Sequence, residues 1–527
     1  MTESKLEPGN AGLLAKTVET TICSRSQSVP PILFSMLSGG LMSLCYPHAD
    51  FGWLAFVAMT PFLRTFPYVR TRTAFAYGFV CGLTYFTCLL YWIAVFAATK
   101  IGGFGVAAWI ILSAREALWS GLFAALVNVL WKKSGPLIRC IGAASIWTSC
   151  EWLRQLGPLG FGWGDLAYSQ WHFLPFIQIA SITGIWGITW LIVYINAAVA
   201  SMDRRTLALA CVLSSIVLIN GGLKIQQENA VGVKTVAASL QANISEDVPY
   251  AGLRPASSDY FYGTLSQFDR MAQAAKDRCG ATICVTAETS IPGYPNLDLP
   301  LKSILRGISQ KDGVALIVGA RDVDFKSGLD TNSVFTFLPD GTEYGPYNKS
   351  QLVPFGEYVP YRKDLPFLNS FHVLNFEMQP GSADQAPLPV GGGNKAGIAV
   401  CYESTYPRFL REQVLRGATF DVVVTDDTWY GRTAAAEQHL AMSILRAVET
   451  DRYLVRCAST GVSAVISPTG KVLSRANIFT CAVVSAPIEQ RRDLTFYVCH
   501  GDWFAVLCTA ASVIVLIFLK ENLNRIE

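Results

Sequence analysis

KAGIAVCYES, residues 395–404, is the stretch that decides how the second half of this chain folds. Its apolar run from Ala396 to Val400 has the character of a buried strand, and the strand ends at Cys401. Open α/β sheets bind their ligands at the carboxyl ends of the strands, so a thiol held there is a candidate nucleophile. Free cysteine is also among the most buried residue types, which makes simple packing the alternative. Candidate partner residues elsewhere in the chain are needed to distinguish a catalytic cysteine from one that only packs in the core.

The composition indicates that part of the chain lies in a membrane. Only 15% of its 527 residues are charged, against about 25% in soluble domains, and 51% are hydrophobic. The net charge of +3 gives no reason to expect nucleic acid as a partner. The 14 cysteines and 5 histidines show no metal-ligand spacing, so we expect neither a metal nor another cofactor.

Long apolar stretches predict about eight membrane-spanning helices, since about 20 apolar residues cross a bilayer. They lie near residues 31–47, 51–63, 74–97, 104–131, 137–153, 175–200, 205–223 and 503–519. The expected organisation is therefore a tail at 1–30, a transmembrane region at 31–223, an outer domain at 233–495, a final span at 503–519 and a tail at 520–527.

Positive charges in the flanks of these stretches predict the orientation. Most flanking Lys and Arg residues belong to one set of loops and the two tails, whereas the other short loops carry only Lys100 and Arg154. Because Lys and Arg are enriched on the cytoplasmic side, both termini should be cytoplasmic and the domain at 233–495 should lie on the outer side.

Two features of the apolar half have two interpretations each. Arg115 and Glu116 fall inside an apolar stretch, where they could form a structural ion pair or line a substrate cavity. The aromatic loop GPLGFGWGDLAYSQW, residues 157–171, could anchor in the lipid interface. Alternatively, this loop could be a lipid entrance or a surface on which the outer domain docks.

Strands and helices alternate through the outer domain, which predicts an α/β fold of about 250 residues. Expected strands lie near 233–241, 314–320, 333–338, 421–427, 453–458 and 462–467, and expected helices near 256–277, 299–309, 404–417 and 433–450.

Glu288 and Lys349 are the candidate partners of Cys401. Glu288 ends a second apolar run, and Lys349 lies in a loop that Pro and Gly residues would hold in place. A carboxylate can take the proton of the thiol, and an ammonium can stabilise the oxyanion formed when the thiolate attacks a carbonyl. In isolation, Glu288 is better explained as an acid of a helix N-cap region or turn, and Lys349 as a surface lysine.

The order of Glu288 in TAETSIP, Lys349 in YNKSQLVPFGEYVP and Cys401 in VCYES resembles the nitrilase or carbon–nitrogen hydrolase superfamily. That resemblance implies an αββα sandwich with a Glu-Lys-Cys triad. The phrase at 347–360, joined to membrane spans before and after the domain, resembles the bacterial apolipoprotein N-acyltransferase family across nearly the whole chain.

The resemblance implies a role for each matching residue. Cys401 would be the nucleophile, Glu288 the general base and Lys349 the oxyanion stabiliser. Supporting or substrate-binding residues would be Glu357, Tyr402, Glu403, Asn332 and Trp429. The chain departs from the family's usual Ser-Asn-Asp phrase at 425–427, where it has Thr-Asp-Asp, and from the family's pattern at Ser245 and Tyr250.

The activity implied by the resemblance is a two-step acyl transfer. The first step moves an acyl chain from a membrane phospholipid to Cys401, and the second moves it from the thioester to the N-terminal amine of a diacylglyceryl-cysteine apolipoprotein. The enzyme would be a monomer in the bacterial inner membrane with its catalytic domain in the periplasm, and arms at about 357–380 would admit lipid. The alternatives are a membrane-anchored amidase or nitrilase and a non-catalytic transporter or scaffold.

Overall fold

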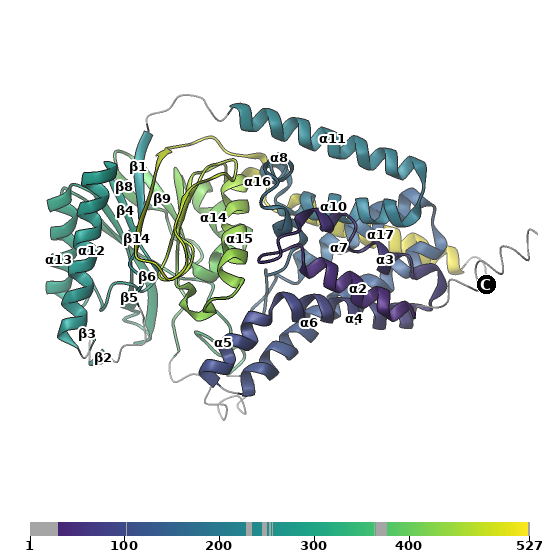
Figure 1. Ribbon diagram of the computed structural model, residues 1–527, viewed down its shortest axis with the longest axis horizontal. Coiled ribbons are helices and arrows are strands. Elements are labelled where there is room, and N and C mark those ends of the chain that lie inside the picture. Colours follow the sequence, from purple (N-terminus) through teal and green to yellow (C-terminus); the bar gives the residue numbers. More distant parts are fainter. Residues whose placement is uncertain are drawn as a thin grey trace, which may run out of the picture.

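The chain has a helical part and an α/β part, which lie side by side (Figure 1). This computed structural model describes residues 30–101, 103–227, 234–244, 250–251, 254–255, 257–362, 364 and 377–524. The expected N-terminal tail and the end of the C-terminal tail therefore lie outside the described residues, as does most of the segment expected to form mobile arms.

Eight helices of more than one or two turns make up the described helical part. They are α2 (Pro31–Ser43), α4 (Thr71–Leu89), α5 (Tyr91–Ile101), α6 (Gly103–Lys133), α7 (Pro136–Leu153), α10 (Ile185–Ser201), α11 (Arg204–Gln227) and α17 (Trp503–Asn524). Helices α7 and α10 are largely buried, whereas α6 and α11 expose large apolar side chains such as Ile111 (67%) and Ile219 (63%). Exposed apolar surface of this extent is typical of a membrane or protein interface.

Several of the predicted spans are interrupted, so the expectation of a continuous helix is wrong there. By length and composition, two helices of the described residues could cross a membrane, Gly105–Lys133 and Arg204–Gln227. The stretch 51–63 forms only η2 (Gly52–Phe56) and α3 (Thr60–Leu63), and 74–97 is divided between α4 and α5.

The stretch 175–200 is also divided, into α8 (Leu174–Ile177), α9 (Ala180–Thr183) and α10. Gly184 ends α9 with φ +64°, outside the range of a right-handed helix. Prolines begin α3 and α8, as expected of a residue that helices tolerate only in the first turn.

The α/β part contains two six-stranded sheets, with strand orders β14-β1-β4-β5-β6-β7 and β13-β12-β11-β10-β9-β8. The first sheet consists of β1 (Lys234–Gln241), β4 (Ile283–Thr286), β5 (Ala315–Val323), β6 (Asp330–Phe337), β7 (Glu343–Asn348) and β14 (Ala482–Glu489). The second consists of β8 (Leu388–Gly391), β9 (Asn394–Val400), β10 (Phe420–Thr425), β11 (Leu454–Ala458), β12 (Ala464–Ile466) and β13 (Val472–Arg475).

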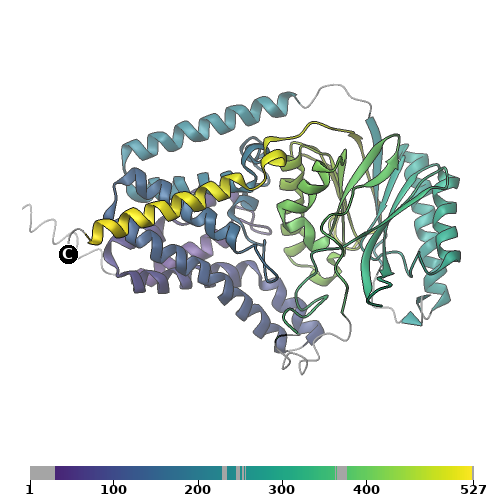
Figure 2. The same ribbon diagram turned by 180° about the vertical axis from the view of Figure 1, so that it is seen from behind.

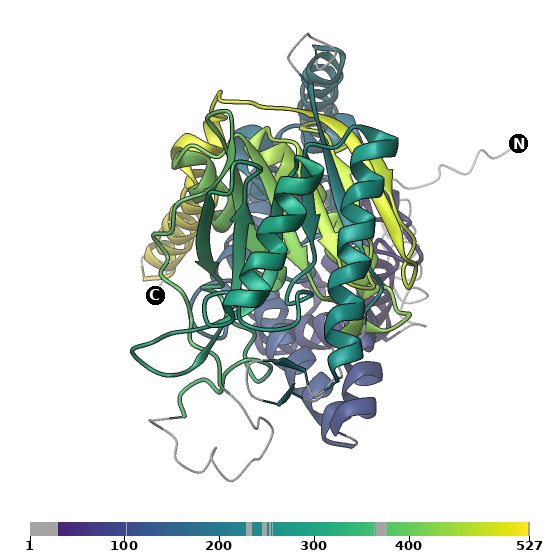
Figure 3. The ribbon, with the colours of Figure 1, turned by 90° about the vertical axis from the view of Figure 1, so that its left-hand side faces the viewer.

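Helices cover the outer face of each sheet, which completes four layers (Figures 1 and 3). Helices α12 (Ser258–Cys279) and α13 (Leu299–Asp312) pack on the first sheet through the apolar cluster that includes Phe268 and Leu305. Helices α14 (Pro407–Leu415) and α15 (Ala435–Thr450) lie between the second sheet and the helical part (Figure 2). Apolar side chains of both sheets, among them Val285 and Ile398, fill the space between them. The expected αββα sandwich is confirmed.

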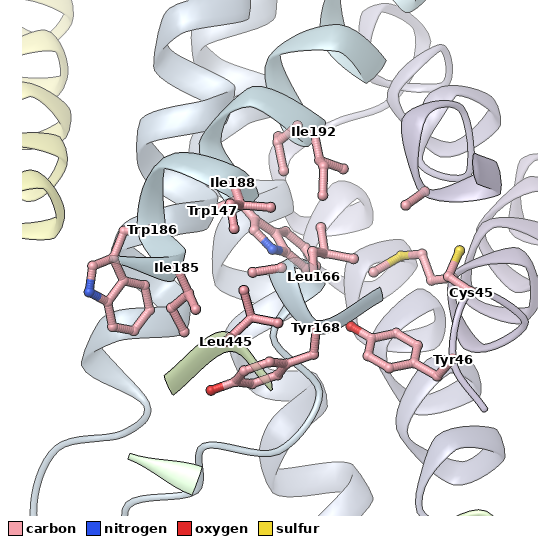
Figure 4. Packing of buried hydrophobic residues seen from close by; sticks show 14 of the residues in the cluster. Cys45, Tyr46, Trp147, Leu166, Tyr168, Ile185, Trp186, Ile188, Ile192 and Leu445 are labelled. Carbon is pink, nitrogen blue, oxygen red and sulfur yellow. The ribbon is translucent and has the colours of Figure 1, made fainter. Parts of the chain in front are cut away.

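The aromatic loop at 157–171 is a docking surface for the α/β part. Trp163 and Tyr168 are buried, and Trp163 Nε1 donates to Gln438 Oε1 of α15 at 2.7 Å. Tyr168 Oη donates to the carbonyl of Thr405 at 3.2 Å. Figure 4 shows Leu445 of α15 beside Tyr168, in the same apolar cluster. Of the interpretations of this loop, docking is the one these contacts bear out.

Arg115 and Glu116 form the ion pair that was one of their two interpretations. Glu116 is fully buried and pairs with Arg115 and, at 3.3 Å, with Arg154. Arg154 in turn binds the Asp165 carboxylate and donates to the Trp163 carbonyl at 2.9 Å. The buried charges of the helical part therefore help to fix the docking loop.

Candidate active site

Two carboxylates and one ammonium meet between the sheets at the ends of β4 and β7. Lys349 Nζ lies 3.0 Å from Glu288 Oε1 and 2.8 Å from Glu357 Oε1. All three side chains are largely buried, at 1% exposed for Lys349, 7% for Glu288 and 13% for Glu357. Asn332 of β6 donates to Glu288 Oε1 at 2.7 Å and to Glu357 Oε1 at 3.4 Å, so it holds the two carboxylates in a fixed relationship.

Cys401 reaches the same cluster from the second sheet. It follows β9 directly, while Asp426 follows the neighbouring parallel strand β10, and the Asp426 backbone N–H donates to Glu288 Oε2 at 2.7 Å. Cys401 takes φ +50°, a left-handed conformation that is uncommon for a residue other than glycine. Such backbone strain is concentrated at functional sites.

Burial and the charges of the cluster together set the protonation states of Lys349 and Cys401. Burial disfavours the Lys349 ammonium, but the Glu288 and Glu357 carboxylates outweigh it and hold the pKa of Lys349 well above its usual value. Burial, followed by the Glu288 carboxylate, holds the pKa of the Cys401 thiol well above its usual value. The resting site therefore contains a charged lysine and a neutral thiol, and the thiol needs a base to become nucleophilic.

Glu403 connects the loop that carries Lys349 to the strand that carries Cys401. It is fully buried, and its carboxylate accepts from the backbone N–H of Ser350 at 2.7 Å and of Val400 at 2.8 Å. Burial raises the pKa of Glu403, and these N–H groups oppose that effect. Glu403 thus has a position suited to fixing the distance between the two reactive side chains.

Tyr402 and Trp429 both contact the helical part. Tyr402 Oη donates to the carbonyl of Gly160 in the docking loop at 3.0 Å. Trp429 is 45% exposed, and its ring packs edge-on against Phe96 of α5, with 5.6 Å between the centroids. Both residues therefore lie where the α/β part meets the helical part.

Sequence reasoning missed a second polar network, on the α15 side of Cys401. His439 contacts Ser404 and the Cys401 carbonyl, and Asp427 links His439 to Arg456. The only sequence signal was the stretch TDDTWYGRTAAAEQHLAMSILRAVE at 425–449, in which a lone histidine had no evident partner.

Of the positions at which the chain departs from the family pattern, the structure describes the Thr-Asp-Asp phrase at 425–427. Asp426 is 2% exposed and its carboxylate accepts from the Thr428 N–H at 3.0 Å. Burial raises the pKa of Asp426 to about 7, and the neighbouring Glu288 charge adds to the effect. Ser245 and the side chain of Tyr250 lie outside the described residues.

Both halves of the chain match models of known protein families. Residues 38–198 match the family model described as the apolipoprotein N-acyltransferase N-terminal domain, and residues 236–493 match the carbon-nitrogen hydrolase model. The apolipoprotein N-acyltransferase of Gloeobacter violaceus is 31% identical over 521 residues, which cover 95% of this chain and 96% of that protein. The chain belongs to the apolipoprotein N-acyltransferase family.

A second relative and one solved structure are also similar to parts of this chain. The apolipoprotein N-acyltransferase of Geobacter metallireducens is 30% identical over 516 residues, covering 94% of this chain and 96% of that protein. Among solved structures, a carbon-nitrogen hydrolase from Helicobacter pylori is 19% identical, with a TM-score of 0.37 over 49% of this chain and 89% of that chain. The chain is thus an acyltransferase of lipoprotein maturation built on a nitrilase-like domain, and the amidase alternative is not favoured.

Proposed function

We propose that this member of the family transfers an acyl chain from a membrane phospholipid to Cys401, and from Cys401 to the N-terminal amine of a diacylglyceryl-cysteine apolipoprotein. The observation that carries the proposal is the buried Lys349 ammonium shared by Glu288 and Glu357, in a cluster whose charges act on the Cys401 thiol. This arrangement supplies a base, a cation and a nucleophile for acyl transfer without a metal or a cofactor.

In the first step, Glu288 takes the proton of the Cys401 thiol as the sulfur attacks the ester carbonyl of the phospholipid. The carbon–sulfur bond forms, Lys349 stabilises the oxyanion, and the ester carbon–oxygen bond breaks. The leaving alcohol takes the proton from Glu288 and departs as a lysophospholipid. The cluster suits this proton transfer because it keeps the same net charge when the proton moves from sulfur to carboxylate.

In the second step, the acceptor amine attacks the thioester and Glu288 takes its proton. The carbon–nitrogen bond forms, the carbon–sulfur bond breaks, and the proton on Glu288 returns to the sulfur. Glu357 keeps Lys349 in place, since its second oxygen accepts from the Val353 N–H at 2.7 Å. Two substrates that use one site in turn follow ping-pong kinetics.

The helical part would bring both lipid substrates to the site. Its exposed apolar side chains, for example Ile111 on α6 and Ile219 on α11, support a multi-pass arrangement in the inner membrane. The distribution of Lys and Arg residues beside the apolar stretches supports cytoplasmic termini and a periplasmic α/β domain at 233–495. Because the described residues of one chain supply the whole cluster, a monomer suffices for the reaction.

Intact mass spectrometry tests the chemistry. The full-length protein is incubated with phospholipid vesicles, and one acyl chain should be added to the peptide that contains Cys401 and be released by neutral hydroxylamine. No added mass on that peptide, or mass added to a Cys401→Ala variant, would contradict the proposed reaction.

Labelling with a membrane-impermeant maleimide tests the orientation. Cys481 is exposed in the α/β part, so in spheroplasts it should react without lysis, whereas a Cys481→Ser variant should lose that label. Reaction of Cys481 only after lysis would place the domain in the cytoplasm.

A further inference from the structure

His439 of α15 contacts the backbone of the candidate nucleophile. Its Nε2 lies 2.8 Å from Ser404 Oγ and 3.2 Å from the carbonyl oxygen of Cys401. The Ser404 hydroxyl lies 2.7 Å from the same carbonyl oxygen. His439 and Ser404 are both fully buried, so these contacts exclude bulk water.

The other ring nitrogen of His439 is held by an ion pair. Nδ1 lies 3.0 Å from Asp427 Oδ1, and Asp427 Oδ2 lies 2.7 Å from the Arg456 guanidinium. Although burial opposes it, Arg456 and then His439 lower the pKa of Asp427 to about 2. An ionised carboxylate only accepts hydrogen bonds, so Nδ1 of His439 carries the hydrogen.

The neutral ring leaves Nε2 as an acceptor. Burial, followed by the Arg456 charge, lowers the pKa of His439, so the ring is uncharged at neutral pH. The single hydrogen of the Ser404 hydroxyl then has two acceptors in reach, Nε2 and the Cys401 carbonyl. Ser404 therefore bridges the fixed ring and the backbone of Cys401.

The Ser404 bridge acts on a strained part of the chain, the backbone of Cys401. Its φ of +50° is strained for a residue with a Cβ atom, and such conformations persist only where the surroundings enforce them. The direction of the sulfur depends on this dihedral angle, since the side chain leaves the backbone at the same atom. A displacement of about 1 Å at a reacting group can cost about 10²-fold in rate.

The helical part reaches the same histidine. The Trp163 ring of the docking loop lies 5.6 Å, centroid to centroid, from the His439 ring. Trp163 also donates to Gln438, the residue before His439, at 2.7 Å. We propose that His439 is a positioning residue that fixes the Cys401 backbone through Ser404, and that Trp163 holds His439 in place.

This inference rests on the proposed role of Cys401, and rates of thioester formation test it. Full-length variants are compared on vesicles of phosphatidylethanolamine and phosphatidylglycerol by intact mass, and each rate is normalised to the folded fraction measured by circular dichroism. His439→Leu and Ser404→Ala should each lower the maximal rate by about 10²-fold and leave the KM for phospholipid unchanged, because neither residue is exposed to substrate.

Conservative variants separate positioning from general stability. His439→Gln places an amide near Nε2, within reach of Ser404, whereas His439→Asn reaches only toward Asp427. Gln should therefore recover about tenfold more rate than Asn. The matched control His500→Gln changes an exposed histidine and should match the unsubstituted protein. Equal rates for Gln and Asn, or a wild-type rate for Ser404→Ala, would overturn the positioning role.

Trp163→Phe, alone and combined with His439→Gln, tests the link to the helical part. If Trp163 acts through His439, the double variant should be no slower than the slower single variant, whereas independent effects would multiply. Multiplied losses would overturn the role of Trp163. Failure of the proposed function itself is distinguishable, because the unsubstituted protein would then form no thioester.

Discussion

The ammonium of Lys349 and the carboxylate of Glu288, 61 positions apart in the chain, lie 3.0 Å apart with almost no exposure to solvent. Each comes from a different strand end of one sheet, and Glu357 adds a second carboxylate to the same ammonium. A buried charge pair of this kind is sensitive to the loss of one partner, because the remaining charge has neither water nor a counter-charge.

Lys349→Met should leave two buried carboxylates without a cation. The expected result is a loss of about 3–5 kcal/mol in the free energy of unfolding and at least about 10²-fold in the rate of acyl transfer. Denaturation in detergent and thioester formation measure the two effects. Lys302→Met is the control, since the Lys302–Glu343 pair is partly exposed and should contribute at most about 1 kcal/mol. Equal destabilisation by both variants would contradict the prediction.

Cys401→Ala should abolish thioester formation, with a loss of at least about 10³-fold in activity, because it removes the thiol that forms the thioester. The thermal midpoint should change little, since Cys401 is a small side chain. Cys481→Ser, which changes an exposed cysteine of the same domain, should keep the acyl adduct. Residual turnover of Cys401→Ala near that of the control would mean that another nucleophile acts.

Gly319→Ala should inactivate the enzyme without changing a polar group. A Cβ atom at Gly319 would stand 2.2 Å from the carbonyl oxygen of Ala287 and 2.9 Å from the Cα of Glu288, so the general base would have to move. A loss of about 10²-fold in rate is expected from a shift of this size. Gly307→Ala on α13 is the control, because its Cβ would meet no atom within 4 Å, and it should stabilise the helix by about 0.5–1 kcal/mol. Full activity of Gly319→Ala would show that Glu288 tolerates displacement.

Asp426→Asn should remove a pH dependence of stability. In the folded state burial raises the pKa of Asp426 to about 7, from an unfolded value of about 3.9. Between these values the unfolded chain has lost the proton that the folded chain keeps, so stability contributed by Asp426 falls as pH rises from about 4 to 7. Above pH 7 the carboxylate is charged in both states and the penalty is complete.

The variant should therefore gain thermal stability relative to the unsubstituted protein at pH 8 and little at pH 4. Each kcal/mol gained corresponds to about 2–4 °C in Tm for a domain of about 250 residues. Differential scanning fluorimetry across pH 4–8 measures the difference in Tm between the two proteins. A constant difference in Tm across this range would refute the assignment.

Local sequence patterns were sufficient for most elements of the α/β part. The apolar runs predicted β1, β5, β10 and β11, and amphipathic stretches predicted α12, α13 and α15. The strands β7, β8, β13 and β14 were missed, and β8 and β13 have only four residues each, too few for a clear pattern in the sequence. In the helical part, hydropathy alone did not show the breaks that Gly184 and the prolines produce.

Sequence by itself singled out Glu288, Lys349 and Cys401 as candidates, through strand ends, a Pro- and Gly-rich loop and the resemblance to a known family. Tertiary structure alone decided that the backbone of Asp426 would bind Glu288, 138 positions away, and that His439 would contact the Cys401 carbonyl from α15. Strand and helix periodicity is set by neighbours within a few residues. Contacts between distant residues depend on how two sheets and the helical part pack together, and no local pattern encodes that arrangement.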